Sequence, residues 1–387
     1  MISIWERDSF YGETDVLIAG GGLMGLWTAH DLLQMRPTLR ITIMEALPVP
    51  ALASTRNAGF ACFGSPSELW HDRRTMGEDA MWQVVEQRFK GIQKIRSTFG
   101  DAAIGFEPCG GYEVFEAGSD WQGEKLAEKL DSLNRGFQEI TGQDAMYTDR
   151  TADLGQFGLS GFAAMAGNSI EGALHSGKLV KALVNNLMQA GVVYLAGHRV
   201  LWADAEGGRQ KALIARSDGM QLEMISGQIL WATNAGLSQH PDLKDTVLPA
   251  RGQVLLSPPI EGLAMHGTFH AEEGFYYFRH YANRLLIGGA RHLALEVEQT
   301  LEDEPSAPVG DHLRAYIRRH IPQAIQAIGA AGWMHWAGIM GKSAGNKPFV
   351  KEIGPGQWAA FACNGMGVAL TPVVAGMAAR QMIGRSA

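Results

Sequence analysis

The chain has 387 residues, of which 46% are hydrophobic and 19% charged, and its formal net charge is −7. This length exceeds what one hydrophobic core usually serves, so we expect two domains with ample apolar side chains to fill them. The negative charge and the lack of clustered Lys and Arg argue against a nucleic-acid partner, and no run of about 18 apolar residues predicts a transmembrane segment.

The cysteines and the N-terminal residues indicate a cellular compartment. Cys62, Cys109 and Cys363 lie far apart in the sequence and are odd in number, which argues against a disulfide framework or a CxxC metal site. Residues 1–8 include acids and lack the apolar stretch of a signal peptide. We therefore expect a cytoplasmic protein.

The first predicted elements are a strand, a glycine turn and a helix. Residues 15–19 form an apolar run of buried-strand type, and Gly20, Gly22 and Gly25 follow at the GxGxxG spacing. The first glycine permits a sharp turn, the second lets backbone N–H groups approach a pyrophosphate, and the third lets the helix lie close on the sheet. Pro37 is expected to end the helix.

A second strand, residues 40–45, completes this unit and ends in an acid. Glu45 lies 20 residues after Gly25, where a carboxylate can hydrogen-bond the ribose of a dinucleotide. The pyrophosphate would bind at the helix N-terminus, where free N–H groups and the helix dipole favour negative charge. The unit therefore predicts a dinucleotide site, and the acid disfavours NADP because it would repel the 2′-phosphate.

The remaining elements follow from periodicity. Apolar side chains three and four apart predict helices, and short apolar or alternating runs predict strands. The expected helices are 80–99, 124–140, 178–190 and about 311–321, and the expected strands are 192–195, 200–205, 212–215 and 228–232. Residues 249–291 are rich in strands, and residues 358–383 form a strand, a glycine loop and a helix in which Thr371 is the N-cap and Pro372 the first residue. No metal site is predicted, since His266 and His270 lack an HExxH context.

Three further motifs accompany the glycine turn. They are residues 53–60 (ASTRNAGF), 230–236 (LWATNAG) and 364–372 (NGMGVALTP). Together with the turn and Glu45, they resemble the FAD-dependent D-amino acid oxidase and glycine/sarcosine oxidase superfamily over nearly the whole chain. The resemblance implies an α/β fold, with a Rossmann-like FAD-binding domain of glutathione-reductase type and an α+β substrate domain on a mixed or antiparallel sheet.

The resemblance also assigns segments and residues. The FAD-binding domain is expected to be discontinuous, with residues 1–75, 165–237 and 330–387, and the substrate domain to comprise residues 76–164 and 238–329. Cys62 and Cys363 fall near predicted flavin loops, but neither matches a known attachment position, so FAD is expected to bind non-covalently. Arg56 suits bidentate contact with phosphate, with a structural ion pair as the alternative. The expected FAD contacts are Gly20, Gly22, Leu23, Met24, Gly25, Glu45, Ala46, Ser54, Thr55, Arg56, Asn57, Ala58, Gly59, Phe60, Val200, Ala232, Thr233, Asn234, Gly236, Gly338, Asn364, Gly365, Met366, Gly367, Val368, Ala369 and Leu370.

One position departs from the family pattern. Relatives that oxidise amino acids usually carry an arginine where Met340 stands, and that arginine binds the substrate carboxylate. The segment is instead similar to γ-glutamylputrescine oxidase-like members. We therefore expect either a substrate without an α-carboxylate or one held by another cation. Candidates for that cation are Arg251, Arg279, Arg291 and Lys342, and Tyr277 shares a strand face with Arg279 that is expected to line the substrate cavity.

The functional prediction is an FAD-dependent amine or amino-acid oxidase or dehydrogenase. It would oxidise a C–N bond of a small substrate by hydride transfer to flavin N5 and give an imine. Oxygen, a quinone or another carrier is expected to accept the electrons. Two alternatives remain open at this point: an FAD-dependent 2-hydroxy acid dehydrogenase and a flavin-binding regulatory protein without turnover.

Overall fold

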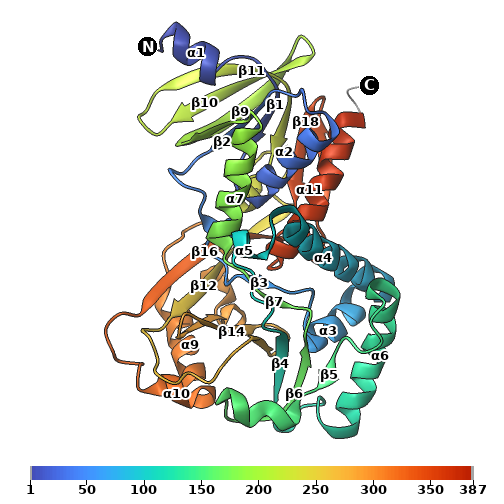
Figure 1. Cartoon of the computed structure of the whole chain (residues 1–387). Coiled ribbons are helices and arrows are strands. Elements are labelled where there is room, and N and C mark those ends of the chain that lie inside the picture. Colours follow the sequence, from blue (N-terminus) through green and yellow to red (C-terminus); the bar gives the residue numbers. More distant parts are fainter. Residues whose placement is uncertain (1, 385–387) are drawn as a thin grey trace.

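The computed structural model describes residues 2–384 and contains two large sheets. The first sheet lies above the second in Figure 1. The first sheet is eight-stranded, with the order β17-β18-β11-β1-β2-β8, and β10 and β9 extend it from β11. The strands of this sheet are β1 (Thr14–Ala19), β2 (Ile41–Glu45), β8 (Val193–Ala196), β9 (His198–Glu206), β10 (Arg209–Arg216), β11 (Gln221–Trp231), β17 (Phe349–Gly354) and β18 (Gln357–Phe361).

The second sheet is also eight-stranded and has the order β16-β12-β15-β14-β13-β4-β6-β5. Its pairs are antiparallel except for β13 with β4, which are parallel. The strands of this sheet are β4 (Gly111–Glu116), β5 (Thr148–Asp149), β6 (Phe162–Asn168), β12 (Val247–Leu256), β13 (Thr268–Ala271), β14 (Tyr276–Tyr281), β15 (Arg284–Gly289) and β16 (Met334–Ser343). The short strands β3 (Phe60–Ala61) and β7 (Gly172–Ala173) pair with each other.

Helices cover both sheets. They are α1 (Ile4–Phe10), α2 (Leu23–Met35), α3 (Pro66–Met76), α4 (Glu78–Phe99), α5 (Asp101–Ile104), α6 (Gly123–Thr141), α7 (Ser176–Gln189), α8 (Leu295–Glu298), α9 (Ala307–His320), α10 (Pro322–Ile325) and α11 (Gly367–Gly384). Short 3-10 helices occupy Leu52–Ser54, Thr151–Phe157, Asn234–Gln239, Arg291–Leu293 and Ala344–Asn346. None of the helices in residues 2–384 combines the length and the apolar character needed to cross a bilayer.

The predicted strand, glycine turn, helix and second strand are present as β1, α2 and β2. β1 pairs in parallel with both β2 and β11. Gly20 has φ +114°, a conformation that L side chains rarely adopt, and a Cβ on Gly25 would overlap the carbonyl oxygen of Gly20. The two glycines therefore allow α2 to begin directly on the turn that follows β1.

Helix α11 packs against both α2 and α4 (Figure 1). Trp27 of α2 is fully buried in this core. The approach of α4 to α11 depends on Gly91, because a Cβ there would overlap the carbonyl oxygen of Ala369. This contact fixes the first turn of α11, which lies beside the cavity described below.

The α/β fold class is confirmed, with a parallel core in the first sheet and a mixed, mainly antiparallel second sheet. The division into domains remains a prediction, and its segment 330–387 includes β16, which pairs with β12 of the second sheet.

The predicted start of the last helix is wrong. α11 begins at Gly367, and Thr371 donates its hydroxyl to the carbonyl of Gly367. Pro372 therefore lies inside the helix, where the Val368 carbonyl in the first turn lacks the backbone donor that a residue other than proline would supply.

The α4–α11 contact can be tested with a single methyl group. Gly91→Ala should gain about 1 kcal/mol from helix propensity but lose about 1 to 3 kcal/mol or more from the overlap with Ala369. We expect a net fall in the free energy of unfolding in urea. Gly155→Ala is the matched control, because nothing lies within 4 Å of a Cβ at Gly155. Equal stability of the two variants would contradict the packing argument.

Candidate active site

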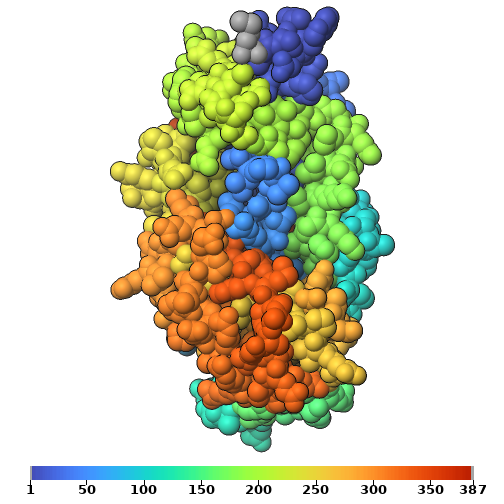
Figure 2. All heavy atoms as spheres, turned by 90° about the vertical axis from the view of Figure 1, so that its left-hand side faces the viewer, coloured from blue at the N-terminus to red at the C-terminus, as the bar shows by residue number. Residues whose placement is uncertain are grey.

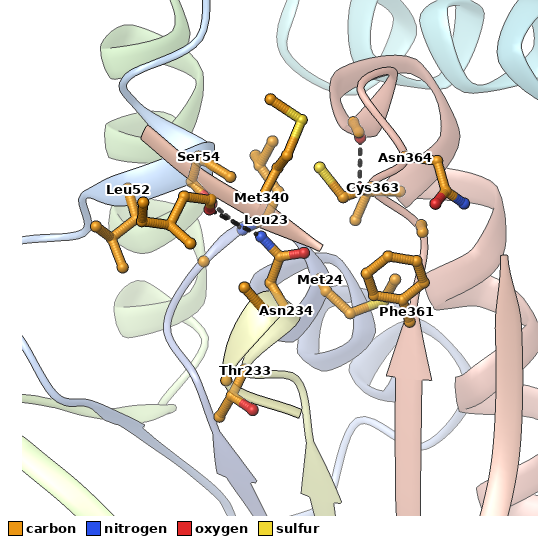
Figure 3. Close-up of a pocket in the computed structure, with 18 of the residues that line it drawn as sticks. Leu23, Met24, Leu52, Ser54, Thr233, Asn234, Met340, Phe361, Cys363 and Asn364 are labelled. Atoms are coloured by element: carbon orange, nitrogen blue, oxygen red, sulfur yellow. Dashed lines mark hydrogen bonds between the residues drawn. The ribbon is translucent and has the colours of Figure 1, made fainter. Parts of the chain in front are cut away.

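A cavity of about 1280 Å³ runs along the junction of the two sheets and is lined by residues from both. Figure 2 shows the face of the molecule on which the loop near residue 50 reaches the surface beside the segment near residue 340. In Figure 3, Ser54, Asn234, Met340 and Asn364 surround this space from four separate segments of the chain. The volume exceeds that of an ordinary small-molecule pocket, so it has room for a dinucleotide and a substrate.

One end of the cavity is formed by the turn after β1 and the N-terminus of α2. The backbone N–H of Leu23, the first helical residue, donates to Ser54 Oγ at 3.0 Å. A Cβ on Gly22 would lie 2.7 Å from that oxygen, so only glycine leaves this approach open. Anionic groups bind well at such a helix N-terminus, which suits the pyrophosphate expected from the sequence.

Glu45 lines the same end of the cavity and is bound to the backbone. Its carboxylate accepts from the N–H groups of Gly21 and Leu47, each at 3.0 Å. Burial raises the pKa of the Glu45 carboxyl above its usual range. The buried hydroxyl of Tyr194 has no hydrogen-bond partner and lies close to the same turn. Contact between Glu45 and a ribose remains a prediction.

The loop of residues 51–60 is held by its own asparagine. The Asn57 amide nitrogen donates to the carbonyls of Ala53 and Ser54, and its oxygen accepts from Gly59 N at 2.9 Å. Arg56 forms the ion pair that the sequence left as the alternative to a phosphate contact: Nη1 lies 2.5 Å from Asp303 Oδ2.

The loop before α11 closes the cavity on another side. Asn364 has φ 46° in the left-handed region, and its side chain accepts from Ser343 N at 2.8 Å. Lys342 Nζ donates to the Asn364 carbonyl at 3.3 Å. Because α11 begins at Gly367, its first N–H groups belong to this loop, closer to the cavity than the sequence predicted.

Most residues that the sequence assigned to FAD line the cavity; Gly25, Thr55 and Leu370 do not. Gly25 and Leu370 are packed inside helices, and Thr55 donates its hydroxyl to the Pro50 carbonyl. A buried, unpartnered donor supports the fit to a dinucleotide: Trp231 Nε1 lacks a hydrogen-bond partner, and its residue lines the cavity.

Two of the predicted substrate residues are wrong, because both arginines are bound elsewhere. Arg251 is buried and donates through Nε and Nη2 to Glu298, at 3.0 and 2.9 Å. Arg279 is 4% exposed and donates to the Gly59 carbonyl at 3.0 Å, so it supports the loop of residues 51–60 from behind. Tyr277, Arg291, Met340 and Lys342 do line the cavity.

A helix that the sequence analysis missed supplies acids to the second-sheet end of the cavity. Glu68, His71 and Asp72 of α3 share one helix face and line the cavity. Ser65, Pro66 and Glu68 form a helix-start signature that could have revealed α3. Glu68 pairs with Arg88 at 3.0 Å. Asp72 is 8% exposed and its carboxylate has no hydrogen bond or ion pair among the described residues.

Burial changes the proton affinities of the groups at this end. It raises the pKa of Asp72 to about 6, with a further contribution from the negative charge of Glu68. It lowers the pKa of His270 to about 4, so that this imidazole is neutral near pH 7, and it raises the pKa of Tyr277 to about 12. Asp72 is therefore a carboxyl in the cavity that can gain or lose a proton close to neutral pH. Among residues 2–384, no group of three or more His, Cys, Asp and Glu side chains has a metal-binding arrangement.

Comparisons with known proteins agree with this geometry. Residues 15–381 match the family described as FAD dependent oxidoreductase. The chain belongs to that family. The resemblance found in the sequence is thus confirmed, and FAD is the cofactor that the cavity accommodates. When bound, FAD would be held by the turn at Gly20 and Gly22, the N-terminus of α2 and the Asn364 loop.

Individual relatives of this FAD dependent oxidoreductase are distant in sequence. The probable oxidoreductase OrdL of Rhizobium meliloti (strain 1021) is 24% identical over 97% of this chain and 84% of that protein. Glycine oxidase from Bacillus cereus ATCC 14579 superposes with a TM-score of 0.69 at 19% identity, covering 96% of this chain and 95% of that one. L-proline dehydrogenase from P. horikoshii gives a TM-score of 0.73 at 16% identity, covering 97% and 94%.

Two buried carboxyls that hold α3 predict how stability depends on pH. Glu113 accepts from Ser67 N and Glu171 from Phe63 N, each at 2.7 Å, and burial raises both pKa values to about 7. Between about pH 4.5 and 7 the native state then binds more protons than the unfolded state, so stability is greatest below this range and falls as pH rises.

Buried histidines with a lowered pKa, such as His270, act in the opposite direction, so the variant is compared with the wild-type protein. We expect Glu113→Gln to lower the difference between the Tm near pH 5 and the Tm near pH 8 by a few degrees. Glu139→Gln, which changes an exposed acid of α6, is the control. A pH dependence of the Tm that Glu113→Gln leaves unchanged would contradict the argument.

Whether FAD is bound covalently or non-covalently can also be tested. Burial raises the pKa values of the Cys62 and Cys363 thiols, which keeps both residues in the unreactive thiol form. Acid precipitation of the FAD-loaded protein should therefore release intact FAD into the supernatant. Flavin absorbance that stays with the pellet, and that Cys62→Ser or Cys363→Ser removes, would show a covalent bond instead.

Proposed function

We propose that this FAD dependent oxidoreductase oxidises the C–N bond of a small amine or amino acid to an imine. The observation that carries the proposal is the unpartnered, buried carboxylate of Asp72 in the cavity that accommodates FAD. A buried carboxylate without a partner is costly, and an ammonium group is the ligand that would offset the cost. Glu68 and Glu273 also line the cavity, but Glu68 is paired with Arg88 and Glu273 lies 2.9 Å from His71, whereas Asp72 is unpaired. A site for an ammonium group favours an amine or amino acid over a 2-hydroxy acid.

The residues of the cavity have separate roles in this reaction. The ammonium group of the substrate binds at Asp72, which takes up the proton that must leave before the C–N carbon can donate a hydride. FAD, when bound, supplies the acceptor of that hydride. The substrate thereby loses two electrons and two hydrogens, and the imine is released to hydrolyse. Phe60 makes edge-to-face ring contacts with His270 at 5.0 Å and with Tyr277 at 5.9 Å, and the three rings form an aromatic wall of the cavity.

Anaerobic reduction of the flavin tests the reaction class. Amines, amino acids, N-methyl amino acids and 2-hydroxy acids would be mixed with the FAD-loaded protein, and the loss of the oxidised flavin absorbance would be recorded. We expect at least one compound with an oxidisable C–N bond to reduce the flavin at a saturable rate. Reduction by 2-hydroxy acids alone, or by none of these compounds, would contradict the proposal.

The proposed role of Asp72 predicts how kcat/KM depends on pH. The kcat/KM for the active amine should rise as pH increases through about 6, because Asp72 must be ionised to accept the proton. Asp72→Asn should lower kcat/KM by about a hundredfold and remove this step from the profile. Asp131→Asn, which changes an exposed acid of α6, should leave the profile unchanged. Persistence of the step in Asp72→Asn would show that another group titrates there.

A further inference from the structure

The cavity also contains two cations that nothing in the preceding mechanism uses. Arg291 and Lys342 both line it, and both are partly buried. The Arg291 guanidinium makes no hydrogen bond or ion pair among the described residues, and Lys342 donates only to the Asn364 carbonyl. The charge of Arg291 acts on Lys342, and two partly buried positive charges close to each other carry an electrostatic and a desolvation cost, which an anionic ligand would offset.

Two carboxylates whose charges act on Arg291 or Lys342 are already paired with other residues. Glu298 lies near enough to influence Arg291, but it accepts from Arg251, Gln253 and Ser306 through both of its oxygens. Glu68, which influences Lys342, is paired with Arg88 at 3.0 Å. Neither Glu298 nor Glu68 is therefore available to neutralise the two cations. The charge of Lys342 also acts on Asp72, the acid that the proposed function assigns to the ammonium group of the substrate. The free hydrogen-bonding capacity of Arg291 faces the cavity.

The sheet register relates Arg291 to Met340. On β12, Ala250 pairs with Met340 of β16, and Val254 pairs with Gly288 of β15. Arg291 follows the end of β15, so it leaves the sheet two strands away from Met340, across β12. Lys342 lies two residues after Met340 on the same strand face. The two cations therefore flank the place where the sequence comparison expected an arginine and found methionine.

We propose that Arg291 and Lys342 together bind the carboxylate of the substrate, so that the substrate class is an amino acid or N-substituted amino acid rather than a simple amine. This inference rests on the proposed function. Asp72 and the cation pair lie in one cavity and have opposite charges, which matches the two ends of a zwitterion. Arg291, with a planar guanidinium free of partners, suits bidentate contact with the carboxylate, and Lys342 adds a point charge beside the Asn364 loop.

Calorimetric titration with carboxylates that cannot be oxidised separates binding from turnover. The FAD-loaded protein would be titrated with acetate and benzoate and with the uncharged acetamide and benzamide. We expect each carboxylate to bind at least about tenfold more tightly than its amide. Arg291→Gln and Lys342→Gln should each weaken carboxylate binding by about ten- to a hundredfold, and Arg291→Lys should weaken it less. Arg318→Gln, an exposed change on α9, should have no effect.

The variants are informative only when folded, so the Tm and the FAD content would be recorded for each. Where Arg291→Gln fails to fold, Arg291→Lys and Lys342→Gln carry the test. Equal affinity for carboxylates and amides, or carboxylate affinity that Arg291→Gln leaves unchanged, would overturn the inference.

A substrate pair distinguishes failure of this inference from failure of the proposed function. Arg291→Gln should lower kcat/KM for the active amino acid and spare that for the amine lacking the carboxylate. An equal loss for both substrates would overturn the carboxylate site while leaving C–N oxidation in place. Carboxylate binding that depends on Arg291, in a protein whose flavin no C–N compound reduces, would support the site and refute the proposed function.

Discussion

The close contact between the turn after β1 and the first residues of α2 is the constraint on which the rest of the site depends. Gly20 and Gly25 bring the helix onto the strand because neither position has room for a Cβ. The first N–H groups of α2 consequently have no helical partner and face the cavity. Ser54 meets one of them, and this places the loop of residues 51–60, with the aid of Asn57, between the two sheets. Arg279 holds the same loop from the second sheet.

Local features of the site could be predicted from the sequence, and long-range partners could not. The glycine turn depends on neighbouring residues, so its spacing was sufficient to predict β1, α2 and β2. Strand alternation correctly placed Tyr277 and Arg279 on one face, but it could not show that the Arg279 guanidinium reaches the Gly59 carbonyl instead of the cavity. Arg251 is bound by Glu298, which lies 47 residues later in the chain and in no recognisable motif. The start of α11 was missed because Thr371 and Pro372 fit a helix N-terminus locally, whereas the first turn of α11 packs against Gly91 of α4.

The second-sheet end of the cavity is built from charges that the protein leaves unneutralised. Asp72 on α3 and Arg291 after β15 come from segments more than 200 residues apart, and neither has a partner among the described residues. Unpaired buried charges lower the stability of a folded protein, and they are typical of sites where a bound ligand of opposite charge offsets this cost. On the proposed function, their opposite signs in one cavity would match an amine and a carboxylate on the same substrate, although Met340 replaces the arginine expected from relatives.

If the turn at Gly22 and the N-terminus of α2 hold FAD, a side chain at position 22 should weaken FAD binding. Gly22→Val would place side-chain atoms in the space in front of Ser54 Oγ while leaving the buried faces of β1 and α2 intact. The dissociation constant for FAD would be measured by fluorescence titration of the cofactor-free protein, together with the far-UV circular dichroism. We expect FAD to bind at least about a hundredfold more weakly, with an unchanged spectrum. FAD binding as tight as that of the wild-type protein would contradict this expectation.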